Sequence, residues 1–334
     1  MRILVTGGAG FIGSHTVDAL VAGGHEVRVL DDLSSGTRTN LARHLDAAQG
    51  RHAVELIEGD VRDPAAVRRA VEGCDAVFHG AAIVSVTRSI AEPELVESVN
   101  AGGTLTVLEA APAAGARRLV LASTCAVYGD PPALPVAEDA ATDPLSPYAS
   151  AKLAAEEHCR RFAAAGDLET VCLRYFNVFG PRQDPSSEYS GVIARFIDGA
   201  LAGRPLTIFG DGEQTRDFVY VADVVRANVL ALTGRSHTAG DADGAGGAAR
   251  GIPTDGRPLN VGSGVPTSVA EIAAAVAWLA GVTAPVRYRP ARRGDIRHSQ
   301  ADTARSAALL GFHAETGFDE GLEQTFAAYE RALD

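Results

Sequence analysis

Lysine, methionine, tryptophan and cysteine are all scarce in this chain. Its 334 residues include one methionine, one tryptophan, four cysteines and a single lysine, Lys152. The cysteines lie far apart and form no C-x-x-C pair, a pattern that fits neither a disulfide framework nor a zinc site. We therefore expect a reduced protein without a metal, in which the thiols serve as small apolar side chains.

Long hydrophobic runs and excess positive charge are also missing. No segment approaches the roughly 18 consecutive apolar residues of a membrane span, and the first residues do not resemble a signal peptide. Acidic residues outnumber basic ones, 42 against 30, which gives a formal net charge of -12 and a pI near 5.2. Such a surface repels nucleic-acid phosphates and anionic lipids. We expect a cytoplasmic protein with no nucleic acid and no membrane as partner.

Short apolar segments alternate with amphipathic ones through the first half of the chain. This alternation is typical of βαβ units on a parallel sheet. The predicted strands are 3–6, 26–30, 54–58, 76–79 and 118–122. The sequence thus predicts an α/β fold, in which a doubly wound parallel Rossmann sheet carries a smaller C-terminal α/β substrate domain.

The alternation becomes less regular after about residue 180, which marks the predicted domain boundary. We expect the first domain over 1–180 and the second mainly over 181–334, with 222–262 returning to the first. Residues 234–257 are rich in Gly, Ala and Asp and have no apolar periodicity. This composition predicts a mobile surface insertion.

A glycine turn follows the first predicted strand and precedes a helical segment. Backbone N–H groups in such a turn can approach a pyrophosphate, with the helix N-terminus facing the anion. The second strand ends at Asp31 and Asp32, where a carboxylate can bind a ribose 2′-hydroxyl and repels a 2′-phosphate. The pattern predicts a dinucleotide site that favours NAD, although Arg38 leaves NADP open. The glycines are Gly7, Gly10 and Gly13.

A hydroxyl, a phenol and the only lysine form the predicted catalytic group. Tyr148 and Lys152 lie four residues apart and share a helix face, while Thr124 follows a strand. A tyrosine that acts as a base near neutral pH needs its pKa lowered by about three units. An ammonium about 4 Å away supplies a shift of that order. We predict that Lys152 lowers the pKa of Tyr148 and that Thr124 hydrogen-bonds the same substrate oxygen.

The helix that carries this pair is predicted to begin after Ser146 and to end at Gly166. Glu156 lies four residues before Arg160, as Glu157 does before Arg161. Such pairs stabilise exposed helix faces, so we expect both of them on the solvated side.

Together these residues resemble the extended short-chain dehydrogenase/reductase family, and within it the group of UDP-galactose and UDP-N-acetylglucosamine 4-epimerases. The resemblance covers nearly the whole chain. Further segments that carry it are 60–61, 79–82, 123–129, 173–180, 210–220 and 292–299.

The resemblance implies a tightly bound NAD that is regenerated in each turnover. The cofactor-binding residues that it implies, beyond the glycine turn and the acidic pair, are Phe11, Ile12, Asp60, Val61, Gly80, Ala81, Ala82, Asn100, Tyr148, Lys152 and Tyr175.

The resemblance also implies a UDP-sugar substrate. It assigns the diphosphate to Asn177, Arg216 and Arg292, with Arg293 as an alternative to Arg292. It assigns the uracil to Phe209, the ribose to Asp295, the 4-hydroxyl to Thr124 and a gate beside C2 to Ser299. A serine gate leaves room for an N-acetyl group, so we expect turnover of N-acetylated UDP-hexoses in addition to, or above, plain ones.

The implied reaction is reversible inversion at C4 of the hexose. Alternatives in the same fold are a UDP-glucuronate 4-epimerase, a sugar-nucleotide reductase and a 4,6-dehydratase. A dehydratase needs acidic residues just after the hydroxyl, where this chain has Cys125 and Ala126. A non-catalytic dinucleotide sensor usually lacks the tyrosine and lysine. Segments 94–114 and 148–165 resemble the helices that form a four-helix bundle, so we expect a homodimer.

Overall fold

A seven-stranded sheet forms the centre of the computed structural model, which describes residues 1–45, 54–185, 191–234, 236–237, 252–281, 285–291 and 296–332. All neighbouring strands pair in parallel, in the order β12-β6-β5-β4-β1-β2-β3. This confirms the predicted doubly wound Rossmann fold. The strands are β1 (Arg2–Thr6), β2 (Glu26–Asp31), β3 (Glu55–Glu58), β4 (Ala76–His79), β5 (Arg118–Thr124), β6 (Glu169–Tyr175) and β12 (Asp255–Val261).

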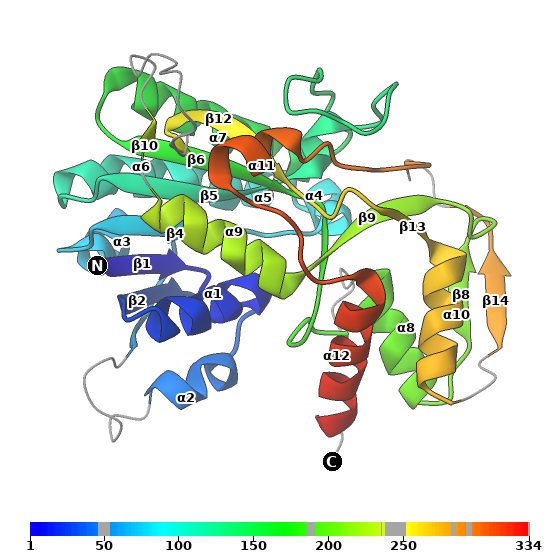
Figure 1. Cartoon of the computed structure of the whole chain (residues 1–334). Helices are drawn as coiled ribbons and strands as arrows, with labels where there is room; N and C mark the ends of the chain where they lie inside the picture. Colours follow the sequence, from blue (N-terminus) through cyan, green and yellow to red (C-terminus); the bar gives the residue numbers. More distant parts are fainter. Residues whose placement is uncertain are drawn as a thin grey trace.

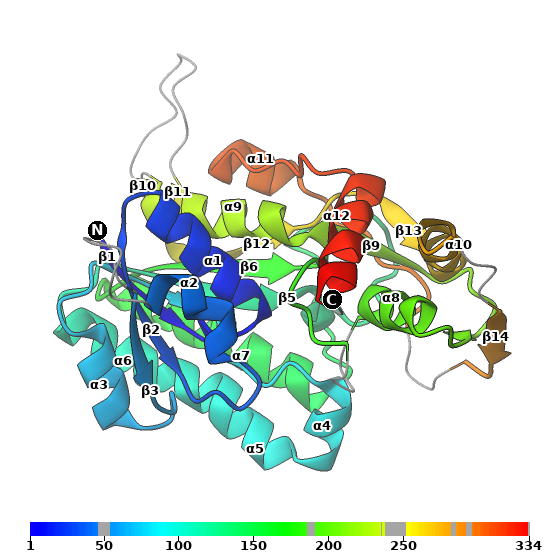
Figure 2. The same cartoon turned by 90° about the horizontal axis from the view of Figure 1, so that it is seen from below.

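Helices cover both faces of this sheet (Figure 2). The helices α1 (Phe11–Ala22), α9 (Val221–Thr233) and α11 (Ala304–Leu310) bury apolar side chains against one face. The helices α3 (Pro64–Val71), α6 (Gly103–Ala113) and α7 (Pro147–Ala165) do so against the other. Each fully buried Val or Leu contributes about 1.5–3 kcal/mol, so the two cores hold the helices on the sheet.

The segment expected as one helix over 94–114 is interrupted. Helix α5 (Pro93–Glu97) passes into a π-helical turn, η3 (Ser98–Gly102), before α6 begins. Shorter elements are α2 (Ala42–Leu45), α4 (Val86–Ala91) and the 3-10 turns η1 (Arg38–Leu41) and η4 (Cys125–Tyr128).

A second group of elements lies beyond the carboxyl ends of the strands (Figure 1). It has its own core, in which Phe179, Phe196 and Phe218 are buried. Its members are β7 (Asn177–Phe179), β8 (Leu206–Phe209), β9 (Thr215–Tyr220), β13 (Pro266–Ser268), β14 (Val286–Arg289), α8 (Val192–Leu201), α10 (Val269–Leu279) and α12 (Phe318–Arg331). Since β12 belongs to the central sheet and α9 packs on its face, the chain passes between the two groups more than once.

The insertion predicted at 234–257 lies largely outside the described residues. Where it is described, β10 (Ser236–His237) pairs in parallel with β11 (Ile252–Pro253). Among the described residues, no helix has the length and apolar character to cross a bilayer.

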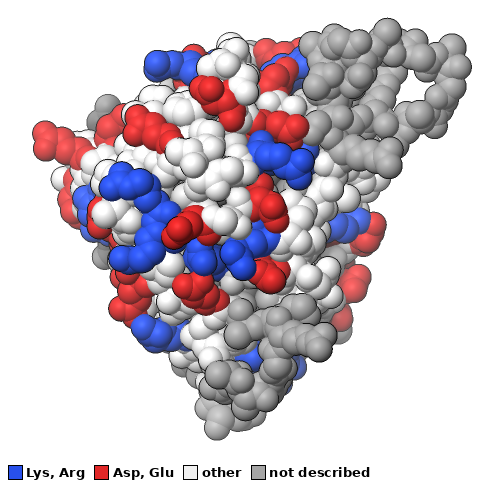
Figure 3. All heavy atoms as spheres, turned by 90° about the vertical axis from the view of Figure 1, so that its left-hand side faces the viewer, with Lys and Arg blue, Asp and Glu red and all other residues white. Residues whose placement is uncertain are grey.

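Ion pairs connect neighbouring strands at the edge where the strands begin. Arg2 pairs with Glu26 across β1 and β2 at 2.9 Å, and Arg28 with Glu55 across β2 and β3 at 2.6 Å. Figure 3 views the molecule from this side and shows basic and acidic side chains intermixed. Charge on this face is therefore locally compensated.

Candidate active site

The turn between β1 and α1 admits only glycine at two positions. Gly7 has a φ of +70°, which disfavours other residues, and a Cβ there would lie 2.7 Å from Ala81 N. A Cβ on Gly13 would lie 2.0 Å from Gly7 O, so helix and turn touch backbone to backbone. The N-terminus of α1 consequently faces the space above the turn, as a pyrophosphate site requires. The residues present therefore fit a dinucleotide.

A cavity of about 850 Å³ opens above this turn, between the carboxyl ends of the parallel strands. Its volume suits a cofactor-sized ligand. The cavity brings together nearly all of the predicted cofactor residues. Those that line it are Gly7, Gly10, Phe11, Ile12, Gly13, Asp31, Asp32, Asp60, Val61, Gly80, Ala81, Ala82, Tyr148, Lys152 and Tyr175.

Asn100 is the one predicted cofactor residue that does not line the cavity. Its buried amide instead holds the Ile83 backbone, because Oδ1 accepts from Ile83 N at 2.8 Å and Nδ2 donates to Ile83 O at 3.0 Å. Ile83 itself lines the cavity. Asn100 thus shapes the wall from behind.

The two aspartates at the end of β2 have different surroundings and different hydrogen-bond partners. Asp31 is buried and accepts hydrogen bonds from Ala9 N and Leu33 N, both at 2.9 Å, so it fixes the glycine turn. Burial raises the pKa of Asp31, while these two bonds act in the opposite direction. Asp32 accepts from Ser34 at the cavity edge.

Arg38, the residue that kept NADP as an alternative cofactor, forms an ion pair with Glu58 at the end of β3. A carboxylate partner weakens the attraction of this arginine for a 2′-phosphate. The arrangement therefore favours NAD.

The predicted catalytic group meets at the cavity. Tyr148 and Lys152 project from α7, whose N-cap is Ser146, and Thr124 ends β5. Burial raises the pKa of Tyr148 to about 12, against which the Thr124 hydroxyl acts. Burial lowers the pKa of Lys152 to about 8, and its Nζ donates to Ala122 O at 2.9 Å.

The predicted direction of the tyrosine shift is wrong for this arrangement. We expected Lys152 to lower the pKa of Tyr148, but burial dominates and raises it. The physical reason is that both side chains are withdrawn from water, while the ammonium is bonded to the end of β5 rather than to the phenol. At neutral pH the phenol holds its proton and the lysine is mostly charged.

Glu156 is also placed differently from expectation. It is fully buried and pairs with Arg174 of β6 at 2.6 Å, not with Arg160 on the solvated side. Arg160 pairs with Glu157 instead. Sequence analysis missed this pair because a charge pattern along a helix does not tell which face is buried.

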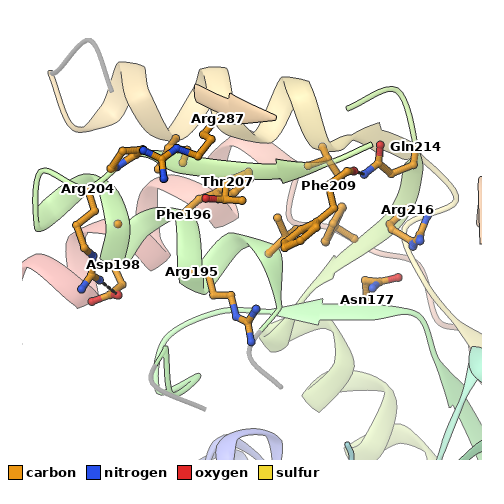
Figure 4. Close-up of a pocket in the computed structure, with 16 residues that line it drawn as sticks. Asn177, Arg195, Phe196, Asp198, Arg204, Thr207, Phe209, Gln214, Arg216 and Arg287 are labelled. Carbon is orange, nitrogen blue, oxygen red and sulfur yellow. Dashed lines mark hydrogen bonds and ion pairs between the residues drawn. The ribbon is translucent and has the colours of Figure 1, made fainter. Parts of the chain in front are cut away.

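A second cavity, of about 700 Å³, lies among the elements beyond the sheet (Figure 4). Three predicted substrate residues line it, Asn177, Phe209 and Arg216. In Figure 4 the Phe209 ring projects into this space, with Asn177 and Arg216 at the same end. Strand β7 separates the two cavities, since Asn177 lines this one while its neighbour Val178 lines the first.

Gln214 is a lining residue that sequence analysis missed. Its Nε2 donates to Phe209 O at 2.7 Å and so fixes the end of β8, which carries the ring. Buried Asp217 has a similar role, because it accepts hydrogen bonds from Ser263 N, Gly264 N and Ala301 N. The roles of Gln214 and Asp217 depend on contacts that form only when the chain folds, so no local sequence pattern predicted them.

The remaining substrate predictions are placed less directly. Arg292, Arg293 and Asp295 lie outside the described residues. Ser299 is buried beside β9, where its N–H donates to Thr215 O at 3.1 Å, and its hydroxyl has no hydrogen-bond partner. It lines neither cavity. Within the described part of the chain, no group of three or more His, Cys, Asp or Glu could hold a metal ion.

A family model described as "NAD dependent epimerase/dehydratase family" matches residues 3–242. The chain belongs to this family. A curated relative, the UDP-glucose 4-epimerase of Mycolicibacterium smegmatis, is 41% identical over 327 residues, which cover 97% of each chain.

Solved structures of epimerases share the whole fold. One is the UDP-glucose 4-epimerase of Thermotoga maritima with UDP-glucose, at 36% identity and a TM-score of 0.88 over 100% of both chains. Another is the UDP-N-acetylglucosamine 4-epimerase of Methanobrevibacter ruminantium M1 in complex with UDP-N-acetylmuramic acid. It is 34% identical, with a TM-score of 0.86 over 99% of this chain and 98% of that one.

The family model covers epimerases and dehydratases, and the residues after Thr124 distinguish between these two reactions. The segment after Thr124 forms η4, which begins with Cys125 and Ala126. Burial raises the pKa of Cys125 to about 12, so its thiol is not an acid of carboxylate strength. The dehydratase alternative is therefore not favoured.

Proposed function

We propose that the chain is an NAD-dependent 4-epimerase of UDP-hexoses, an isomerase. One observation carries the proposal: Tyr148, Lys152 and Thr124 line the dinucleotide cavity, and the adjoining cavity holds Asn177, Phe209 and Arg216. The similarity to UDP-glucose 4-epimerases over nearly the full length supports it.

In this proposal, side chains of the protein transfer the proton of the sugar 4-hydroxyl. Tyr148 exchanges a proton with the 4-hydroxyl, and Thr124 hydrogen-bonds the same oxygen. Lys152 offers its charge to the phenol and to the ribose hydroxyls of the cofactor. A group positioned to donate and accept a proton in this way contributes about 10²–10⁴-fold to the rate. Bound NAD supplies the reversible oxidation at C4, held by the glycine turn and the acidic pair.

The second cavity anchors the nucleotide while the sugar turns. Phe209 packs on the uracil, and Arg216 and Asn177 hold the diphosphate. Charge-assisted bonds of this type are roughly twice as strong as neutral ones, so the anchor persists while the 4-keto sugar presents its other face. Arg292 and Asp295 are assigned to diphosphate and ribose, and Asn100 to holding Ile83 in the wall of the cofactor cavity.

The wider organisation follows the same proposal. We assign NAD binding to 1–180 and nucleotide-sugar binding mainly to 181–334, with 222–262 in the first domain. We place the enzyme in the cytoplasm as a homodimer that pairs α7 and the 94–114 segment in a four-helix bundle. Light scattering tests the dimer, and a monomer at micromolar concentration would refute it.

Incubation of the purified protein with each UDP-hexose, without added cofactor, tests the proposed reaction. We expect separation of the sugar nucleotides to show both C4 epimers, with no net change in absorbance at 340 nm. A reductase would instead require and consume added NAD(P)H. Absence of epimers for both plain and N-acetylated substrates, with NAD present in the preparation, would refute the proposal.

Substrate width has a separate test at Ser299. If this position borders C2 of the sugar, Ser299→Tyr removes room for an N-acetyl group. We expect kcat/KM for UDP-N-acetylglucosamine to fall about tenfold relative to UDP-glucose, which is about 1.4 kcal/mol. Because the serine is enclosed, the melting temperature of the variant is measured alongside. Equal losses for the two substrates would rule out a gate.

A further inference from the structure

A buried ion pair lies directly behind the proposed catalytic residues. The side chains of Glu156 and Arg174 are 0% and 4% exposed. Arg174 donates to Glu156 from Nε at 2.9 Å and from Nη2 at 2.6 Å, and Ser123 Oγ donates at 2.5 Å. Desolvation makes such a pair weak evidence for stability alone. Its position therefore calls for another explanation.

Every member of this cluster adjoins the catalytic cavity. Glu156 follows Lys152 by one turn of α7, so the two side chains project from the same helix face. Its partners each precede a residue that lines the cavity: Arg174 precedes Tyr175, and Ser123 precedes Thr124. The carboxylate therefore joins the ends of β5 and β6 to the helix that carries the lysine.

We propose that Glu156 is a positioning residue that keeps the buried Lys152 ammonium charged at the pH at which the enzyme works. This inference rests on the proposed function, in which the charge of Lys152 assists Tyr148. Without an anion nearby, a buried amine favours its neutral form. Burial lowers the pKa of Lys152, and the Glu156 charge is the largest influence that raises it again.

Other titratable groups around the lysine do not replace this carboxylate. Burial lowers the pKa of His79 on β4 to about 3, so its ring is neutral. Burial raises the pKa values of Tyr128 and Tyr148 to about 12, so both phenols are neutral. Cys159 on α7 also acts on Lys152, while the thiol of Cys172 on β6 and the Arg174 guanidinium belong to the buried cluster around Glu156.

The composition of the chain allows a direct measurement. Because Lys152 is the only lysine, incorporation of lysine labelled with ¹³C at Cε gives one lysine side-chain resonance. Its chemical shift against pH reports the protonation of this amine in the whole protein, independently of activity. We expect the wild-type midpoint near pH 8.

The decisive variant is Glu156→Gln, which keeps the size and a hydrogen-bond acceptor but removes the charge. It also leaves Arg174 unpaired. We expect the lysine midpoint to fall by about 1 pH unit or more. Since the ammonium is then lost at lower pH, the decline of kcat/KM on the alkaline side should move down by the same amount.

Two further variants separate charge from packing. Glu157→Gln removes the same charge from the next position, which is exposed and paired with Arg160, and should leave the midpoint unchanged. Glu156→Gln with Arg174→Gln removes both charges, so its midpoint should lie between those of wild type and the single variant. A purely structural role predicts no shift in any folded variant.

An unchanged midpoint in folded Glu156→Gln overturns the inference. If Glu156→Gln does not fold, the double variant is titrated instead. A lysine midpoint equal to that of the wild type in the double variant would also overturn the inference. Failure of the wild type to interconvert UDP-hexoses would refute the proposed function while the lysine titration still stands. The two failures are therefore distinguishable.

Discussion

Two arginine–glutamate pairs at opposite ends of the parallel strands lie in opposite surroundings. Where the strands begin, Arg2 and Glu26 join β1 to β2 and lie partly in water, with side chains 45% and 59% exposed. At the edge where the strands end, Arg174 and Glu156 are withdrawn from water altogether. The same chemical pair thus occupies two very different dielectric surroundings.

This difference explains what each pair can do. In water, an ion pair gains little because solvent and salt screen it, and exposed pairs contribute about 0–1 kcal/mol. In a buried site the Coulomb interaction reaches neighbouring groups, so one carboxylate can change the charge state of a lysine one helical turn away. The Arg2–Glu26 pair is therefore expected to tolerate substitution, and the Arg174–Glu156 pair is not.

The largest effect is expected for Tyr148→Phe, which removes one hydroxyl at the carboxyl edge. Loss of the proton carrier should lower kcat for epimerisation by about 10³-fold, or about 4 kcal/mol, while NAD stays bound. Turnover of UDP-glucose, followed by separation of epimers, measures kcat. The absorbance of the bound cofactor measures whether NAD is retained.

If Tyr148→Phe turns over UDP-glucose as fast as the wild type, Tyr148 is not the proton carrier. The matched position is Tyr128, whose phenol is buried close by but donates to Asn260 Oδ1 at 2.7 Å and does not line the cavity. Tyr128→Phe should therefore affect stability more than the chemical step.

An effect of similar size, but on stability, is expected for Arg174→Met. The change leaves Glu156 as an unpaired buried carboxylate, which costs about 3–5 kcal/mol. Urea unfolding followed by circular dichroism should show a lower midpoint than that of the wild type. A loss below about 1 kcal/mol would mean that this pair contributes no more than an exposed one, and would remove the distinction between the two pairs.

The sequence predicted the sheet and the glycine turn because their signals are local. Apolar alternation and glycine spacing act within a few residues, and the spacing of Tyr148 and Lys152 showed that they share a helix face. Burial is not local. The position of Glu156, the rise in the pKa of Tyr148 and the enclosure of Ser299 all depend on which elements pack above them. A single helix pattern contains no such information.

The smallest effect is expected at the opposite edge, for Glu26→Gln. This variant removes the carboxylate from the exposed pair with Arg2, whose Nε also donates to Glu26 at 3.0 Å. The amide still accepts a hydrogen bond, so the free energy of unfolding should fall by about 0.5 kcal/mol or less, and the difference should shrink in 1 M salt because the Debye length is then about 3 Å. Epimerase turnover should equal that of the wild type, since the edge where strands begin is remote from both cavities. A salt-independent loss above about 2 kcal/mol, or a change in the lysine titration, would show that charge at this edge reaches the site after all.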